Sequence, residues 1–97
     1  MLFDGFDWDK GNRLKCRKHG VSLEEIETLF ERPALVGPDG AHSAVERRYR
    51  VLGRTAAGRF MFLIFTWRER DGLRLIRPIS ARYMHAKEVA QYGQKIP

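Results

Sequence analysis

The chain has 97 residues, of which 18 are Lys or Arg and 12 are Asp or Glu, so its formal net charge is +6 at pH 7. This length excludes repeat and multidomain architectures and predicts one domain over residues 1–97 with a modest hydrophobic core. With 43% hydrophobic and 31% charged residues, the composition excludes wholesale disorder and fibrous low-complexity classes.

The positive charge is unevenly distributed along the chain. Residues 1–31 carry a small acidic excess, whereas residues 45–82 contain ten arginines and three acidic residues. Thirteen of the 18 cations are arginines, whose planar guanidinium suits bidentate contact with phosphate or carboxylate groups. This charge indicates a polyanionic partner; the alternative is a solvated basic face that aids solubility.

The cysteine and histidine content limits the chemistry. The chain has a single cysteine, Cys16, which excludes an intramolecular disulfide. Cys16 is either a small buried apolar group or a nucleophile activated by the nearby His19. His19, His42 and His85 show no metal-ligand spacing, so we expect no metal and no cofactor. No apolar run approaches the length of a membrane span and the N-terminus does not read as a signal peptide, so we expect a cytoplasmic protein that binds no membrane.

The first part of the chain predicts an extended arm and a short helix. Residues 2–8 alternate loosely between apolar and acidic side chains, which is typical of a short edge strand or arm. Asp9 can cap a helix that runs to about Lys18. Gly20 then ends it, because glycine readily takes the left-handed conformation found after helices.

A second helix is predicted from a capping box, Ser22-Leu23-Glu24-Glu25. Apolar residues follow at three- and four-residue spacing, at Leu23, Ile26, Leu29 and Phe30. Pro33 stops this pattern, and residues 32–44 lack periodicity, which predicts a long loop.

The pattern then changes to period two, which predicts three antiparallel strands. The strands are expected at residues 45–54, 60–67 and 73–79, joined by turns at residues 55–58 and at Asp71-Gly72. The middle strand is apolar on both faces, so its aromatic side chains are expected in the core and not stacked on bases. Pro78 lacks an amide N–H, which predicts a sheet edge or the end of a ladder there.

A final helix is expected after Ser80 as its N-cap, running to about Tyr92 and ending at Gly93. The element order predicts the α+β fold class: a short N-terminal strand and two helices, a three-stranded antiparallel sheet and a C-terminal helix.

Two groups of polar residues are candidates for a phosphate site. Glu46 and Arg48 share a face of the predicted strand. They are either a general base beside an arginine that binds phosphate, or an ordinary surface ion pair. Arg77 and Arg82 flank Ser80, whose predicted helix N-terminus favours an anion. The alternative for this second group is an ordinary cap with solvated arginines.

Cleavage of RNA without a metal needs a base, an acid and cations that stabilise the charge on the phosphate. His19 can be acid or base, because imidazole titrates near neutral pH, and Glu46 can be a base. The alternative for His19 is a cap or packing residue at the helix end.

The chain resembles the BrnT toxin family in a set of motifs that occur in order over nearly its whole length. They are Trp8-Asp9, Lys18-His19-Gly20-Val21-Ser22, Glu46-x-Arg48 and Ile76-Arg77-Pro78-Ile79-Ser80-Ala81-Arg82. The resemblance implies a small RelE-like ribonuclease toxin that cleaves RNA to arrest growth. It also implies a small DNA-binding antitoxin, BrnA-like or of the ribbon-helix-helix class, in a hetero-oligomer with the toxin.

The resemblance also implies which residues act. We expect catalytic roles for His19, Glu46, Arg48, Arg77 and Arg82, and RNA binding by Lys18, Arg47, Arg59 and Ser80. Asn12 and Cys16 stand where many family members have Lys and Asn, so activity here is weaker or differently targeted if that lysine contacts RNA. The alternative function is a non-catalytic basic module that binds nucleic acid or the antitoxin.

Overall fold

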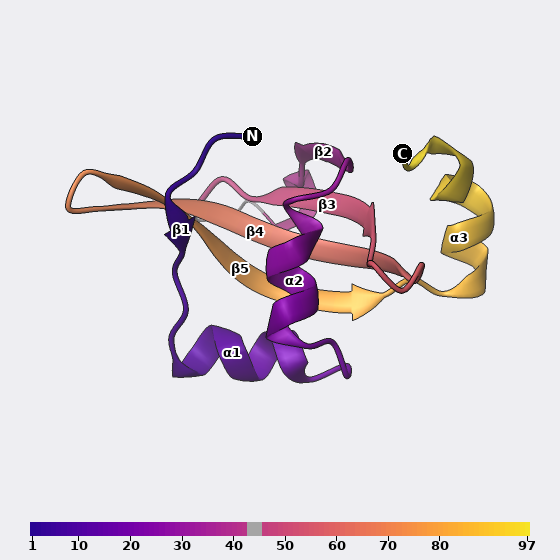
Figure 1. The fold of residues 1–97 in the computed structure, drawn as a ribbon, viewed down its shortest axis with the longest axis horizontal. Coiled ribbons are helices and arrows are strands. Elements are labelled where there is room, and N and C mark those ends of the chain that lie inside the picture. The colour runs from indigo at the N-terminus through magenta and orange to yellow at the C-terminus, as the bar shows by residue number, and fades with distance from the viewer. Residues whose placement is uncertain (43–45) are drawn as a thin grey trace.

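The computed structural model describes residues 1–42 and 46–97, which build a five-stranded sheet in the order β1-β5-β4-β3-β2 (Figure 1). The strands are β1 (Gly5–Phe6), β2 (Leu35–Pro38), β3 (Tyr49–Arg54), β4 (Phe60–Arg70) and β5 (Leu73–Tyr83). The helices are α1 (Lys10–Arg17), α2 (Leu23–Leu29) and α3 (Ala86–Tyr92), with 3-10 turns at Gly40–His42 and Gly93–Lys95. β1 runs parallel to β5 and the other neighbours are antiparallel, so the sheet is mixed.

The two N-terminal helices begin where the sequence predicts. The Asp9 carboxylate accepts the Asn12 N–H at 3.0 Å, and the Asn12 side-chain oxygen accepts the Asp9 N–H at 2.7 Å. Ser22 and Glu25 form the same reciprocal pair at the start of α2. Gly20 has a φ of +85°, which allows the chain to reverse between the helices.

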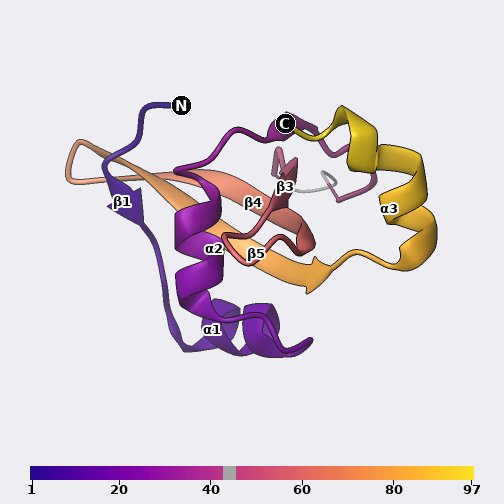
Figure 2. The ribbon, with the colours of Figure 1, turned by 45° about the vertical axis from the view of Figure 1, so that its right-hand side comes forward.

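The core lies between α2 and one face of the sheet (Figures 1 and 2). Ile26 and Leu29 of α2 are fully buried and belong to one cluster with Leu63 and Phe65 of β4. The backbone of β3 comes so close to α2 that a Cβ at Gly53 would lie 2.8 Å from Leu29 Cδ1. Burial of this apolar stripe is what holds such a short helix on the sheet.

The predicted three-stranded antiparallel sheet is wrong in the number of strands, although the α+β class is correct. β2 lies within the predicted loop of residues 32–44 and pairs with β3 from Leu35↔Leu52 to Pro38↔Tyr49. β1 is only two residues long and pairs with β5. Both strands are too short to show a period, and pairing with a long neighbour defines them. Val45, the predicted start of the first long strand, lies outside the described residues; β3 begins at Tyr49.

The third long strand does not end at Ile79, because β5 continues to Tyr83. A register shift between Ile64 and Phe65 leaves Ile79 as an extra residue, since Phe65 pairs with Pro78 and Ile64 with Ser80. Pro78 is tolerated inside the strand because its carbonyl faces α1, where it accepts the Asn12 side-chain N–H at 2.9 Å. β1 pairs with β5 only as far as Ile76, so no strand lies beside Pro78 on that edge. The missing N–H of Pro78 therefore costs no hydrogen bond between strands.

Ser80 is therefore a strand residue, and its predicted role as a helix N-cap is wrong. The ladder with β4 extends past it to Tyr83, because sheet pairing outweighs a local cap signal. α3 begins after His85, whose backbone N–H donates to the Glu88 carboxylate at 2.9 Å. The helix ends at Tyr92 as predicted, and Gly93 keeps a right-handed φ of −56°.

Candidate nucleic-acid interface

The face of the sheet turned away from α2 carries six arginines, and we call it the arginine face. Along β4, Phe62, Ile64 and Thr66 alternate with core residues and therefore lie on this face. The strand register places arginines from three strands with them: Arg50, Arg54, Arg68, Arg70, Arg77 and Arg82. The register thus gathers six of the thirteen arginines on one face of the sheet.

A cleft of about 290 Å³ lies on this face where the end of α1 meets β5. It is lined by His19, Phe62, Ile64, Ser80, Ala81 and Arg82. His19 is exposed and follows Lys18, the C-cap residue of α1. The fold thus brings together His19, Ser80 and Arg82, three predicted site residues from opposite ends of the chain.

Arg82 is held in place beside the cleft by Glu88 of α3. Its two terminal nitrogens donate to the two Glu88 carboxylate oxygens at 2.7 and 2.9 Å, and its guanidinium lies 4.9 Å from the centre of the Phe62 ring. The bond from Arg82, helped by the His85 N–H, lowers the pKa of Glu88 to about 2. The same bond raises the pKa of Arg82, so both groups are ionised at neutral pH.

Arg77 does not join this cleft, so the predicted phosphate site between Arg77 and Arg82 does not form. Its guanidinium contacts Asp7 at 3.3 Å and Asp9 at 2.9 Å, next to the start of α1. A backbone hydrogen bond from Asn12 and the contact with Arg77 lower the pKa of Asp9. The contacts of Arg77 therefore tie α1 and the chain after β1 to β5.

Glu46 and Arg48 are paired as predicted, but they lie in the irregular segment before β3. The Glu46 carboxylate contacts Arg48 at 3.6 Å and accepts a hydrogen bond from Arg68 at 2.8 Å. These cations, Arg68 above all, lower the pKa of Glu46. Sequence reasoning missed Arg68; the alternation along residues 60–70, which places it on the face of Phe62, was the signal for it.

The Glu46 group and the His19 cleft are separate sites on the arginine face. Ile64 lines the cleft, and Arg68 lies four residues further along β4, which is about 13 Å at the usual rise of a strand. Any polymer that contacts both sites must lie along β4.

The remaining predicted RNA-binding residues are divided between the two faces. Lys18 is exposed next to His19, and Arg47 is exposed beside Glu46. Arg59 is on the core side, where its guanidinium lies 3.4 Å from the centre of the Tyr83 ring. The Tyr83 hydroxyl donates to Glu25 at 2.7 Å, so the sheet separates Arg59 from the cleft.

The two positions at which the chain departs from the family pattern are interior. Asn12 is 5% exposed and donates to the carbonyls of Asp7 and Pro78 at 2.9 Å each. Cys16 is fully buried, and burial raises the pKa of its thiol to about 11. Of the two interpretations of Cys16, the geometry favours the buried apolar group over the nucleophile.

Two further findings concern residues 1–42 and 46–97. No group of three or more His, Cys, Asp or Glu side chains there is arranged to hold a metal ion. None of the helices in this part combines the length and apolar character that a bilayer crossing requires.

Fold and site together define a small basic α+β protein with a guanidinium-rich sheet face and a histidine-lined cleft. The family model for BrnT, the ribonuclease toxin of type II toxin–antitoxin systems, matches residues 8–88, and the chain belongs to this family. A search of the curated proteins found no match. The resemblance drawn from the ordered motifs is thus confirmed, and membership implies a protein antitoxin as partner.

Proposed function

We propose that this protein is a metal-independent endoribonuclease that cleaves RNA to arrest growth and is neutralised by a small DNA-binding antitoxin. Family membership supports the ribonuclease class. The observation that carries the proposal is the cleft in which His19 lies with Ser80 and Arg82 on the arginine face. The imidazole can carry one of the two proton transfers that cleavage by the ribose 2′-hydroxyl needs, and the guanidinium can stabilise the charge on the phosphate.

In the proposed reaction the 2′-oxygen forms a bond to the adjacent phosphorus, and the bond from phosphorus to the 5′-oxygen breaks. The 2′-hydroxyl loses a proton to a base, and the leaving 5′-oxygen gains one from an acid. We assign one of these proton transfers to His19 and the other to water in the open cleft. Arg82, which Glu88 holds in position, stabilises the charge that develops on the phosphate oxygens.

The group of Glu46, Arg48 and Arg68 binds the same RNA molecule at a point further along β4. The two cations hold a second phosphate of that RNA, and the ionised Glu46 keeps their side chains in position. Lys18 and Ser80 add contacts at the cleft, Arg47 adds one beside Glu46, and Arg77 orders α1 and β5 beneath the substrate.

Cleavage of a labelled RNA in the presence of EDTA tests this proposal. We expect His19→Ala and Arg82→Ala to reduce the cleavage rate by about 100-fold or more each. Arg13→Ala, an exposed change on α1, is the matched control and retains the wild-type rate. Wild-type protein that leaves RNA intact, or two cleft variants that cleave at the wild-type rate, would contradict the proposal.

A non-catalytic basic module is the second candidate, and one observation favours it. Arg48, Arg77 and Arg82 each already contact a carboxylate of the same chain, which reduces the positive charge they offer to a phosphate. RNA binding that weakens steeply with salt and is never followed by cleavage would support this candidate.

A further inference from the structure

The edge of the sheet at β2 has the features of a docking site for an added strand. β2 is the last strand of the sheet, and among the described residues no strand lies beyond it. Val36 is 45% exposed there. Exposed apolar side chains on a sheet edge are commonly covered by a partner, since such edges otherwise promote aggregation.

The backbone of Val36 faces outward from the sheet. The Asp39 N–H donates to the Arg48 carbonyl at 2.9 Å, so the alternation of an antiparallel ladder turns Leu35 and Gly37 toward β3. The N–H and C=O of Val36 therefore point away from β3. Pro38, next in the outward position, has no N–H, as is usual at an edge.

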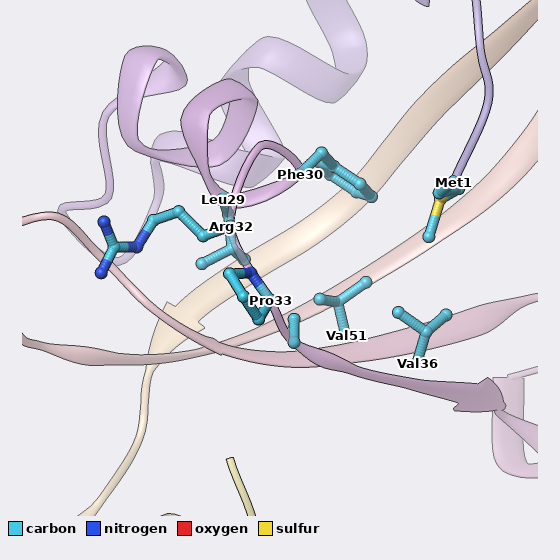
Figure 3. Close-up of a pocket in the computed structure, with 8 residues that line it drawn as sticks. Met1, Leu29, Phe30, Arg32, Pro33, Val36 and Val51 are labelled. Carbon is cyan, nitrogen blue, oxygen red and sulfur yellow. The ribbon is translucent and has the colours of Figure 1, made fainter. Parts of the chain in front are cut away.

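A pocket lies on each face of the sheet beside this edge. On the α2 side a pocket of about 260 Å³ is lined mainly by apolar residues, among them Leu29, Phe30, Pro33, Val36 and Val51 (Figure 3). On the arginine face a pocket of about 240 Å³ is lined by residues that include Leu35, Gly37, Leu52 and Tyr92. A Cβ at Gly37 would meet no atom within 4 Å, so this second pocket has room for a partner's side chain.

The charges around the two pockets are all positive. Arg32 lines the first pocket, and Arg50 and Lys95 line the second. Within the described part of the chain, no Asp or Glu lines either of them. The complementary ligand is an extended chain with apolar side chains for the pockets and carboxylates for these cations.

We propose that the β2 edge binds an extended, acidic segment of the protein antitoxin, which adds a strand to the sheet and places successive side chains into the two pockets. The proposal rests on the antitoxin partner of the proposed function. β2 and β5 are three strand spacings apart, about 14 Å, so this anchor does not use the His19 cleft. Because Arg50 also belongs to the arginine face, a segment anchored here leads the antitoxin onto that face.

Titration of the purified chain with the antitoxin encoded beside it tests the proposal. We expect Val36→Glu to weaken binding by about 30-fold or more, because the new carboxylate repels an acidic strand. Leu14→Glu is the matched control: Leu14 is 58% exposed on α1, and this variant keeps wild-type affinity within about twofold. Equal affinity of the wild type and Val36→Glu, or equal weakening by the two variants, would overturn the proposal.

Hydrogen exchange of the wild-type complex gives a second readout that does not depend on a variant. If the antitoxin adds a strand at this edge, its binding protects the Val36 amide from exchange. An exchange rate that does not change on binding contradicts the proposal. If the chain alone is a dimer that Val36→Glu dissociates, a second copy is the occupant and the antitoxin assignment is wrong.

The cleavage assay separates this proposal from the ribonuclease proposal. Val36→Glu leaves the EDTA-resistant cleavage of RNA at the wild-type rate, because the β2 edge lies outside the cleft. If the wild type does not cleave RNA but Val36→Glu still weakens antitoxin binding, the docking site stands and the ribonuclease function fails.

Discussion

At the scale of single residues, intramolecular carboxylates position the arginines of the arginine face. Glu88 contacts Arg82, Asp7 and Asp9 contact Arg77, and Glu46 contacts Arg68. A guanidinium has five N–H donors, so a bidentate pair leaves donors for a phosphate while it limits the motion of the side chain. The carboxylates thus reduce the net charge of the arginine face and restrict the motion of its arginine side chains.

The Arg82–Glu88 pair predicts a pH dependence of stability. The pKa of Glu88 is about 2 in the folded protein and its ordinary value is 4.5, so the pair stabilises the fold fully above pH 4.5. This contribution, on the order of 1 kcal/mol for a partly exposed pair, is lost as the pH falls from 4.5 to 2. Urea unfolding at pH 7 and pH 3 measures it. Glu88→Gln is less stable than the wild type at pH 7, and the difference narrows at pH 3; a difference that is constant with pH contradicts the assignment.

Cys16 predicts a thiol that does not react in the native protein. It is fully buried and its pKa is about 11, so at pH 8 roughly one thiol in a thousand is ionised. Ellman's reagent at pH 8 labels the protein only after urea unfolds it. Rapid labelling of the folded chain would show that Cys16 is accessible after all.

At the scale of elements, the contact between α2 and β3 determines how the helix sits on the sheet. Leu29 is fully buried, and it packs on Gly53, where the strand has no side chain. The local signals are independent of this contact: the capping box starts α2, and the Asp71-Gly72 turn, with φ values of +52° and +77°, closes the β4–β5 hairpin as predicted. Local chemistry therefore starts α2 and closes the β4–β5 hairpin, and packing determines where α2 lies on the sheet.

This contact predicts that Gly53→Ala is destabilising. The new Cβ would lie 2.8 Å from Leu29 Cδ1 and 3.1 Å from Leu29 Cγ, so the buried Leu29 would have to shift from its packed position. We expect a loss of about 1–3 kcal/mol in the free energy of unfolding, seen as a lower Tm. Gly40→Ala is the control, because a Cβ at Gly40 meets no atom within 4 Å. Equal Tm values for the two variants would refute the tight contact.

At the scale of the whole molecule, six of the thirteen arginines lie together on the arginine face. The other face is covered by α2 and holds the core, and Tyr92 and Lys95 lie beside Arg50 and Leu52 on the arginine face, so a polyanion has the rest of that face on which to bind. The catalytic and the non-catalytic candidate functions share this surface and differ only in what happens at the His19 cleft.

Binding of a 2′-O-methyl RNA, which cannot be cleaved by its own 2′-oxygen, tests the arginine face for both candidates. We expect the logarithm of the binding constant to fall linearly with the logarithm of salt concentration, and Arg70→Ala to reduce that slope by about 0.7, the value for one phosphate contact on a single strand. Arg70 lies on the arginine face with its side chain 60% exposed. Arg13→Ala on α1 leaves the slope unchanged, and equal slopes for all three proteins would place the RNA elsewhere.

The sequence alone was sufficient for the features that depend on neighbours a few residues apart. These include the Asp9 cap of α1, the capping box of α2, the Asp-Gly turn, a strand that begins at Phe60, the α+β class and the ordered motifs of the family. Their physics is local: a side chain satisfies a backbone group three residues away, or glycine permits a positive φ.

The tertiary structure alone decided the features that join distant residues. β2 exists because it pairs with β3, Pro78 is tolerated because β1 has ended beside it, and Ser80 belongs to a strand because β4 extends past it. Asp7 meets Arg77 across 70 positions and Glu46 meets Arg68 across 22, and His19 shares a cleft with Arg82. No local pattern encodes such pairs, because their free energy comes from burial and charge contacts that arise only once the sheet has brought the segments together.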